Sequence, residues 1–202
     1  MIKLDNVSVS YDHLCVLNEF SYDFKAKQIT CLFGPSGCGK TTLLNAVAGL
    51  ISYEGEIYKS SKQSFIFQED KLLPWLTVYD NISVILKGHI NEDEIDNTVK
   101  HYLQLVGLID SSQQYPNQLS GGMKRRVAIA RAFAYPSDIL LMDEPFKGLD
   151  KALKAGIIND FMKLWKEDNR TILLVTHDED VKAFCHHTLM VKGLPLEIND
   201  EI

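Results

Sequence analysis

The chain has 202 residues, 46% of them hydrophobic, and a formal net charge of −6. This length fits one domain, and the hydrophobic fraction is too high for a disordered chain. The acidic balance argues against nucleic acid as a partner. No apolar run approaches the roughly 18–20 residues of a membrane-spanning helix, and residues 1–5 lack the apolar stretch of a signal peptide. We therefore expect a cytoplasmic location.

The first strands are predicted within residues 2–24, where apolar and polar residues alternate, as in Val7-Ser8-Val9-Ser10. This alternation is typical of exposed antiparallel strands. Three later runs, at residues 29–33, 139–142 and 172–175, are almost entirely apolar. Such short runs indicate central strands of a parallel sheet covered by helices. Because ligands bind beyond the carboxyl ends of these strands, the residues that follow each run are candidate site residues.

The residues after the first apolar run form a glycine-rich loop that matches the pattern G-x-x-x-x-G-K-[ST]. The loop amides and the positive end of a helix that begins near Lys40 are suited to bind phosphate oxygens. Lys40 adds a full charge for the β- and γ-phosphates, and Thr41 adds a hydroxyl ligand for Mg²⁺. Kinases, GTPases and motor proteins share this loop, so it predicts nucleotide binding without choosing among them. The candidate nucleotide-binding residues here are Gly34, Pro35, Ser36, Gly37, Cys38, Gly39, Lys40, Thr41 and Thr42.

The segment from about residue 76 to residue 134 is predicted to be mostly helical. One helix is expected to begin in the acidic stretch at residues 91–94, because apolar residues recur at helical spacing from Ile95 to Val106. Gly107 is expected to end that helix. A later helix runs through Arg131, and Pro136 helps to end it.

Two acids follow the second apolar run, and a histidine follows the third. An acid in this place binds Mg²⁺ directly or through water, so Asp143 is a candidate metal ligand. Glu144, the next residue, is a candidate base that orients or deprotonates the attacking water. His177 is a candidate to hydrogen-bond the γ-phosphate and to hold the water and Glu144 in line.

Residues 119–128 read Leu-Ser-Gly-Gly-Met-Lys-Arg-Arg-Val-Ala and resemble the signature motif of ABC ATPases, with Met123 where the family usually has glutamine. The resemblance covers essentially the whole chain. It implies an α/β fold of the P-loop NTPase type, with a mostly parallel central sheet, an N-terminal antiparallel β subdomain and an α-helical signature subdomain. It also implies a single ABC ATPase domain over residues 1–202, with the helical subdomain inserted at about residues 76–134.

The same resemblance assigns roles to four further positions and implies ATP and Mg²⁺ as cofactors. Tyr11 is similar to the aromatic residue that stacks on adenine. Gln68 resembles the Q-loop glutamine, which reaches Mg²⁺ and the attacking water. Asp150 matches the aspartate of the D-loop, which crosses to the partner subunit, and His177 matches the switch histidine.

The signature residues Ser120, Gly121, Gly122 and Met123 are expected at the start of the helix through Arg131. A serine hydroxyl, glycine amides and a helix dipole together form an anion site. In the family this second anion site faces the ATP of the opposite subunit, so two ATP molecules are sandwiched in a head-to-tail dimer. We therefore expect a second ABC ATPase subunit, most simply another copy, as a partner. ATP then favours the closed dimer, and hydrolysis lets it open.

Residues 69–78, which include Leu73-Pro74-Trp75, resemble the ATPase subunits of nitrate, sulfonate and taurine importers. Such subunits lie on the inner face of the cell membrane and drive permease subunits, with an extracytoplasmic solute-binding protein as an indirect partner. One alternative is the ABC ATPase of an exporter or of a lipoprotein-extraction system. Another is a non-transport ABC protein, although this chain lacks the long coiled-coil insertion or second cassette usual there.

Overall fold

The computed structural model describes residues 1–202 and contains both strands and helices. The strands are β1 (Ile2–Tyr11), β2 (Leu14–Phe24), β3 (Ile29–Phe33), β4 (Glu54–Lys59), β5 (Gln63–Ile66), β6 (Ile139–Asp143), β7 (Thr171–Thr176), β8 (His187–Lys192) and β9 (Glu197–Glu201). The helices are α1 (Lys40–Ala48), α2 (Val78–Ser83), α3 (Glu92–Leu105), α4 (Gly121–Ala134), α5 (Lys151–Asp168) and α6 (Glu179–Lys182), with short 3-10 helices η1 (Ile109–Ser111) and η2 (Pro116–Gln118). No helix is both long and apolar enough to cross a membrane.

The chain divides into two compact units. Unit 1 comprises residues 1–65, 138–145 and 170–202, and unit 2 comprises residues 66–137 and 146–169. The α-helices of unit 2 are α2 to α5, and unit 1 holds both sheets. The predicted boundaries of an inserted helical subdomain, at about residues 76 and 134, stay a prediction.

A six-stranded sheet in the order β5-β6-β7-β3-β8-β9 forms the centre of unit 1. Strand β3 pairs in parallel with β7 and β8, and β6 pairs in parallel with β7. Strands β3, β6 and β7 are buried over almost their whole length, which is why their sequences are apolar on both faces. Strand β9, at the edge, runs antiparallel to its neighbour β8. The predicted parallel sheet is confirmed.

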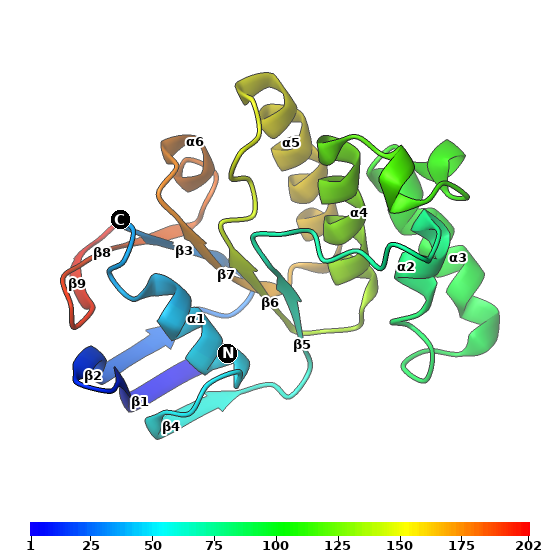
Figure 1. Ribbon diagram of the computed structural model, residues 1–202. Coiled ribbons are helices and arrows are strands. Elements are labelled where there is room, and N and C mark those ends of the chain that lie inside the picture. The colour runs from blue at the N-terminus through cyan, green and yellow to red at the C-terminus, as the bar shows by residue number, and fades with distance from the viewer. The chain divides into compact units, whose positions relative to one another are not determined.

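Helix α1 lies between this sheet and a second, three-stranded antiparallel sheet in the order β2-β1-β4 (Figure 1). Its residues Leu43, Leu44 and Val47 are fully buried and belong to one hydrophobic core with β1 and β3. This core ties the loop that precedes α1 to two layers at once.

The buried face of β1 changes parity halfway along the strand. Ile2 and Leu4 are buried in the first half, and Val7 and Val9 in the second. A bulge at Asn6, where φ is +50°, interrupts the pairing with β4 between Asp5 and Ser8. An extra residue in one strand shifts every later side chain by one position, so the bulge keeps the apolar residues on the core side.

Unit 2 is held together by apolar packing among its helices. Helices α4 and α5 lie side by side (Figure 1), and Phe161 of α5 contacts Phe133 and Phe146 edge to face, with ring centroids 5.7 and 6.0 Å apart. Helix α3 begins after Asn91, and Gly107 follows it with φ at +68°, which confirms both predicted ends. The helical prediction for residues 76–134 is confirmed in α2, α3 and α4.

Gly55 of β4 is expected to tolerate no side chain. Its φ is +89°, and a Cβ would lie 2.3 Å from the carbonyl oxygen of Asn6 in the β1 bulge. Gly49 also has a positive φ, +75°, but a Cβ there would meet nothing within 4 Å. We expect Gly49→Ala to lower the free energy of unfolding by about 1 kcal/mol, for the left-handed backbone alone. Gly55→Ala should lower the free energy of unfolding by about 2–4 kcal/mol, because β1 must move in addition to the backbone strain. Chemical denaturation of both variants measures the difference, and equal losses would contradict the close approach.

Candidate nucleotide site

The glycine-rich loop connects the end of β3 to the start of α1, as predicted. Gly34, its first residue, packs so closely against β8 that a Cβ would lie 2.1 Å from the carbonyl oxygen of Val191. Gly39 stands at the N-cap of α1 with φ at +94° and has no side chain to cap the helix. The first amides of α1 therefore lack an internal side-chain acceptor, which suits them to an external anion.

The ammonium group of Lys40 lies inside this loop rather than in solvent, since the residue is only 5% exposed. Its Nζ donates to the carbonyl oxygens of Gly34 and Pro35 at 2.8 and 2.7 Å. Buried cations need hydrogen bonds of this kind. The lysine thus holds the loop in its curved form and carries a positive charge within it.

Two of the three candidate metal ligands, Thr41 and Asp143, lie in contact. Thr41 Oγ1, in the first turn of α1, donates to Asp143 Oδ1 at the end of β6 over 3.2 Å. Magnesium prefers hard oxygen ligands such as a hydroxyl and a carboxylate. The two side chains present here fit that ion.

Glu144 and His177 form a second contact at the ends of β6 and β7. His177 Nδ1 lies 2.6 Å from Glu144 Oε1, and Thr176 Oγ1 donates to Glu144 Oε2 at 3.4 Å. A carboxylate that is ionised only accepts hydrogen bonds, so Nδ1 of His177 is the donor when Glu144 is ionised. The Glu144 side chain is 13% exposed, and that of His177 is 47% exposed.

The backbone at Glu144 is strained. Its φ is +45°, a left-handed conformation that is costly for residues other than glycine. Its amide still donates to the carbonyl of Val175 at 3.0 Å, which continues the β6–β7 ladder by one residue. Strain of about 1–3 kcal/mol at a site residue persists only where surrounding contacts enforce it. Nothing in the sequence signals this conformation.

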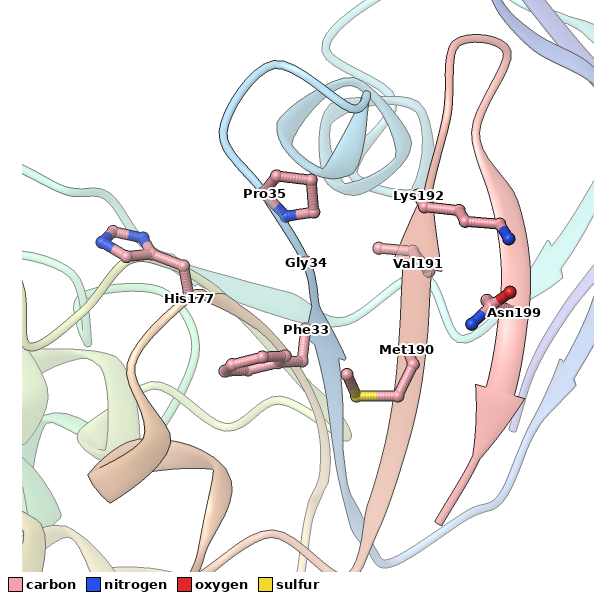
Figure 2. A pocket seen from close by; sticks show the side chains of 8 residues that line it. All are labelled: Phe33, Gly34, Pro35, His177, Met190, Val191, Lys192 and Asn199. Atoms are coloured by element: carbon pink, nitrogen blue, oxygen red, sulfur yellow. The ribbon is translucent and has the colours of Figure 1, made fainter.

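A pocket of about 380 Å³ adjoins the start of the loop. Phe33, Met190 and Val191 give it apolar walls, while His177 lies on one side of the loop start and Lys192 and Asn199 on the other (Figure 2). The pocket thus lies beyond the carboxyl ends of β3 and β8, as expected for a parallel sheet.

Tyr11 is the last residue of β1 and pairs with Leu14 across the turn to β2. It is 48% exposed, so its ring is available to a ligand. Its contact with adenine stays a prediction.

The signature residues begin α4 in unit 2, as the sequence indicates. Ser120 is the N-cap, and its Oγ accepts a hydrogen bond from the Met123 amide at 3.3 Å. The first helical bond of α4 runs from Lys124 N to Ser120 O, so the amides of Gly121 and Gly122 precede the helical ladder. Gly122 is also a packing residue, because a Cβ there would lie 2.6 Å from Leu153 of α5.

The other two predicted residues of unit 2 lie at element ends. Gln68 is exposed and follows β5. Asp150 is the N-cap of α5, where its Oδ1 accepts from the Leu153 amide at 3.0 Å. Sequence reasoning missed this capping role, although an aspartate directly before a helical pattern is the signal that indicates it.

The parallel sheet, the phosphate loop and the strand-end acids together define a P-loop nucleotide-hydrolysing protein. A family model described as ABC transporter matches residues 17–147, more than half of the chain. The chain belongs to this family and is an ABC ATPase.

Several curated relatives resemble the chain over most of its length. The taurine import ATP-binding protein TauB of Roseobacter denitrificans is 36% identical, over 94% of this chain and 76% of the relative. The aliphatic sulfonates import ATP-binding protein SsuB of Bacillus anthracis is 37% identical, over 93% of this chain and 78% of the relative.

Solved structures agree with this assignment. The ATP-binding cassette MJ0796, in a dimeric post-hydrolysis state bound to ADP and Pi, matches with a TM-score of 0.85 and 30% identity, over 100% of this chain and 98% of that one. A transporter described as of the metal-chelate ABC type, in an inward-facing conformation, is 24% identical with a TM-score of 0.83, over 100% of this chain and 81% of that one. At this identity the match shows the fold alone.

Lys40→Ala should lower ATP affinity by about tenfold or more, because it removes the only full positive charge inside the loop and two hydrogen bonds that curve it. Fluorescence titration with a labelled nucleotide measures the affinity. Lys62→Ala, an exposed lysine elsewhere in unit 1, is the matched control and should bind normally. Normal binding by Lys40→Ala would refute the role given to Lys40.

Proposed function

We propose that this chain is the ATP-hydrolysing subunit of an ABC importer for a small anionic or organic solute of the nitrate, sulfonate or taurine type. The observation that carries the proposal is the contact of Thr41 with Asp143 beside the contact of Glu144 with His177. The proposed metal ligand Asp143, the base Glu144 and the orienting group His177 then lie at the ends of the neighbouring strands β6 and β7. The loop suited to bind phosphate lies next to them, since Thr41 contacts Asp143.

Phosphate binding is assigned to the loop from Gly34 to Thr42. Its amides and the start of α1 face the phosphates, and Lys40 supplies the charge. Thr41 and Asp143 would hold Mg²⁺, which neutralises the developing charge on the phosphate oxygens. Tyr11 is assigned to stacking on adenine.

Hydrolysis is assigned to Glu144, His177 and Gln68. Glu144 accepts the proton of the attacking water, and the His177 contact at 2.6 Å keeps its carboxylate in one orientation. Gln68 helps to place that water. The strained backbone of Glu144 supports this role, since strain gathers at reactive positions.

The second half of each site is assigned to another copy of the chain. Ser120, Gly121, Gly122 and Met123 present a helix start that suits a triphosphate bound to the partner, and Asp150 crosses at the same interface. The dimeric cassette structures of MJ0796 support this arrangement. ATP closes the dimer, and loss of the γ-phosphate opens it.

The partners that we propose for transport are those of the taurine and sulfonate import proteins. We assign the chain to the inner face of the cell membrane, bound to permease subunits and supplied indirectly by an extracytoplasmic solute-binding protein. Trp75 is 69% exposed, and an exposed tryptophan of this size is typical of a protein contact. The names of the taurine and sulfonate relatives support import.

Glu144→Gln should retain ATP binding but lower turnover by about 10²–10⁴-fold, because the amide keeps the shape and cannot take a proton. The variant should accumulate as an ATP-bound dimer, which light scattering detects. Hydrolysis at the wild-type rate would exclude Glu144 as the base.

Ser120→Arg should leave ATP binding to the monomer intact and block the dimer, because an arginine fills the space that the partner's phosphate needs. The test is made with Glu144→Gln in both proteins, so that hydrolysis does not dissolve the dimer. Gln104→Arg, at an exposed position of α3, is the control for added charge. An ATP-dependent dimer of Ser120→Arg would count against the shared site.

A further inference from the structure

Two arginines of α4 bind the backbone of the segment that carries Gln68. Arg125 donates from Nη1 to the carbonyl of Phe67 at 3.0 Å and from Nη2 to that of Gln68 at 2.5 Å. Arg131 donates in the same way to the carbonyls of Lys71 and Asp70, both at 3.0 Å. Four of the five carbonyls from residue 67 to residue 71 are therefore held by one helix.

Besides the two arginines, Asn81 bonds the backbone of this segment, at the amide and the carbonyl of Leu73 over 2.8 and 3.0 Å. Residues 67–75 lie outside the helices and strands, and Lys71 adopts a φ of +46°. Backbone carbonyls outside a strand or helix take their hydrogen bonds from side chains or from water. The two arginines give these four carbonyls side-chain donors, whereas the carbonyls of a strand receive backbone donors from the neighbouring strand. We therefore expect the position of the Gln68 backbone to depend on the arginines.

The ion pair beneath these contacts adds little stability. The side chains of Arg125 and Asp70 are 6% and 23% exposed, and Arg125 Nε lies 3.1 Å from Asp70 Oδ1. Neither atom forms a hydrogen bond within the protein. Burial raises the pKa of Asp70 in spite of the nearby positive charges, and burial lowers the pKa of Arg125. Desolvation thus outweighs attraction for both groups, as is common for buried pairs.

We propose that Arg125 is a positioning residue that ties Gln68 to the signature helix. The proposal rests on the function proposed above. Arg125 stands five residues after Ser120, about 8 Å along the axis of α4, so a displacement of the helix start is passed to Gln68 as one rigid movement. Engagement of the partner's triphosphate at Ser120 thereby reaches Gln68 through contacts that lie wholly within unit 2.

Arg126 offers a matched control. It belongs to the same helix, and its Nε lies 3.1 Å from Asp160 of α5, which is not part of the Gln68 segment. Each variant removes one ion pair within unit 2, so each measures how the loss of such a pair affects the stability of the fold. Only Arg125→Ala also releases the carbonyls of Phe67 and Gln68.

The test is a double-mutant cycle on ATP turnover by the full chain. Arg125→Ala should lower kcat by about 10- to 100-fold, and nucleotide affinity should change by less than about twofold. Gln68→Ala should lower kcat as well, and the double variant should be no slower than Gln68→Ala alone, since one acts through the other. Any loss of kcat in Arg126→Ala should instead be additive with that of Gln68→Ala, because Arg126 pairs with Asp160 and not with the Gln68 segment.

Two further variants separate positioning from folding. Arg125→Lys keeps the charge and one donor group, so it should restore part of the turnover. Asp70→Asn combined with Arg125→Met removes both charges, which avoids an unpaired buried carboxylate, and it should remain slow although it unfolds near the wild-type temperature.

Outcomes other than these overturn the inference. Wild-type turnover in Arg125→Ala, or additive losses in Arg125→Ala and Gln68→Ala, would show that Arg125 does not act through Gln68. Either result leaves the proposed function intact, provided that Glu144→Gln still abolishes hydrolysis. Normal turnover in Glu144→Gln would instead contradict the proposed function.

Discussion

Parallel pairing of β3, β7 and β6 is the constraint on which the candidate site depends. In register, Phe33 pairs with Thr176, and Asp143 pairs with Val175. The three strands therefore end at the same edge, although more than a hundred residues of sequence separate β3 from β6 and β7. A shift of one residue in either pairing would turn the strand-end side chains to the other face. The contacts of Thr41 with Asp143 and of Glu144 with His177 exist only because this register is kept.

Buried cations stabilise the two irregular segments that carry site residues. Lys40 holds the phosphate loop through the carbonyls of Gly34 and Pro35, and Arg125 holds the Gln68 segment through two carbonyls. In both segments the backbone lacks the ladder of a strand or helix, and a charged donor takes its place. A lysine suits the tight loop as a point charge, whereas the planar guanidinium reaches two successive carbonyls.

Much of the fold is readable from the sequence because its signals are local. The apolar runs mark the central strands, the loop pattern marks the start of α1, and Ser120 and Gly107 mark helix ends. Three features escape such reading because they depend on contacts distant in sequence. The bulge at Asn6 depends on its pairing with β4, the left-handed backbone of Glu144 on its bond to Val175, and the role of Arg125 on a segment 57 residues earlier.

The helix starts differ in a way that bears on the proposed dimer. Helix α3 has three acids in its first turn, and α5 is capped by the carboxylate of Asp150, so both already have negative charge at their positive ends. Helices α1 and α4 have no acid in the first turn; α1 lacks any side-chain cap, and α4 has only the neutral Ser120. These two starts retain their attraction for an external anion.

One chain thus carries two helix starts suited to phosphate, one in each unit. At the start of α1, Lys40 adds a positive charge to the loop that is suited to bind a triphosphate. The start of α4 has glycine amides and the Ser120 hydroxyl, but no cation in the cap itself. Such a neutral start binds an anion weakly alone and better when the nucleotide is already held elsewhere. The proposed head-to-tail pair of chains would meet this condition twice by symmetry, since each bound nucleotide would be presented to the α4 start of the other copy.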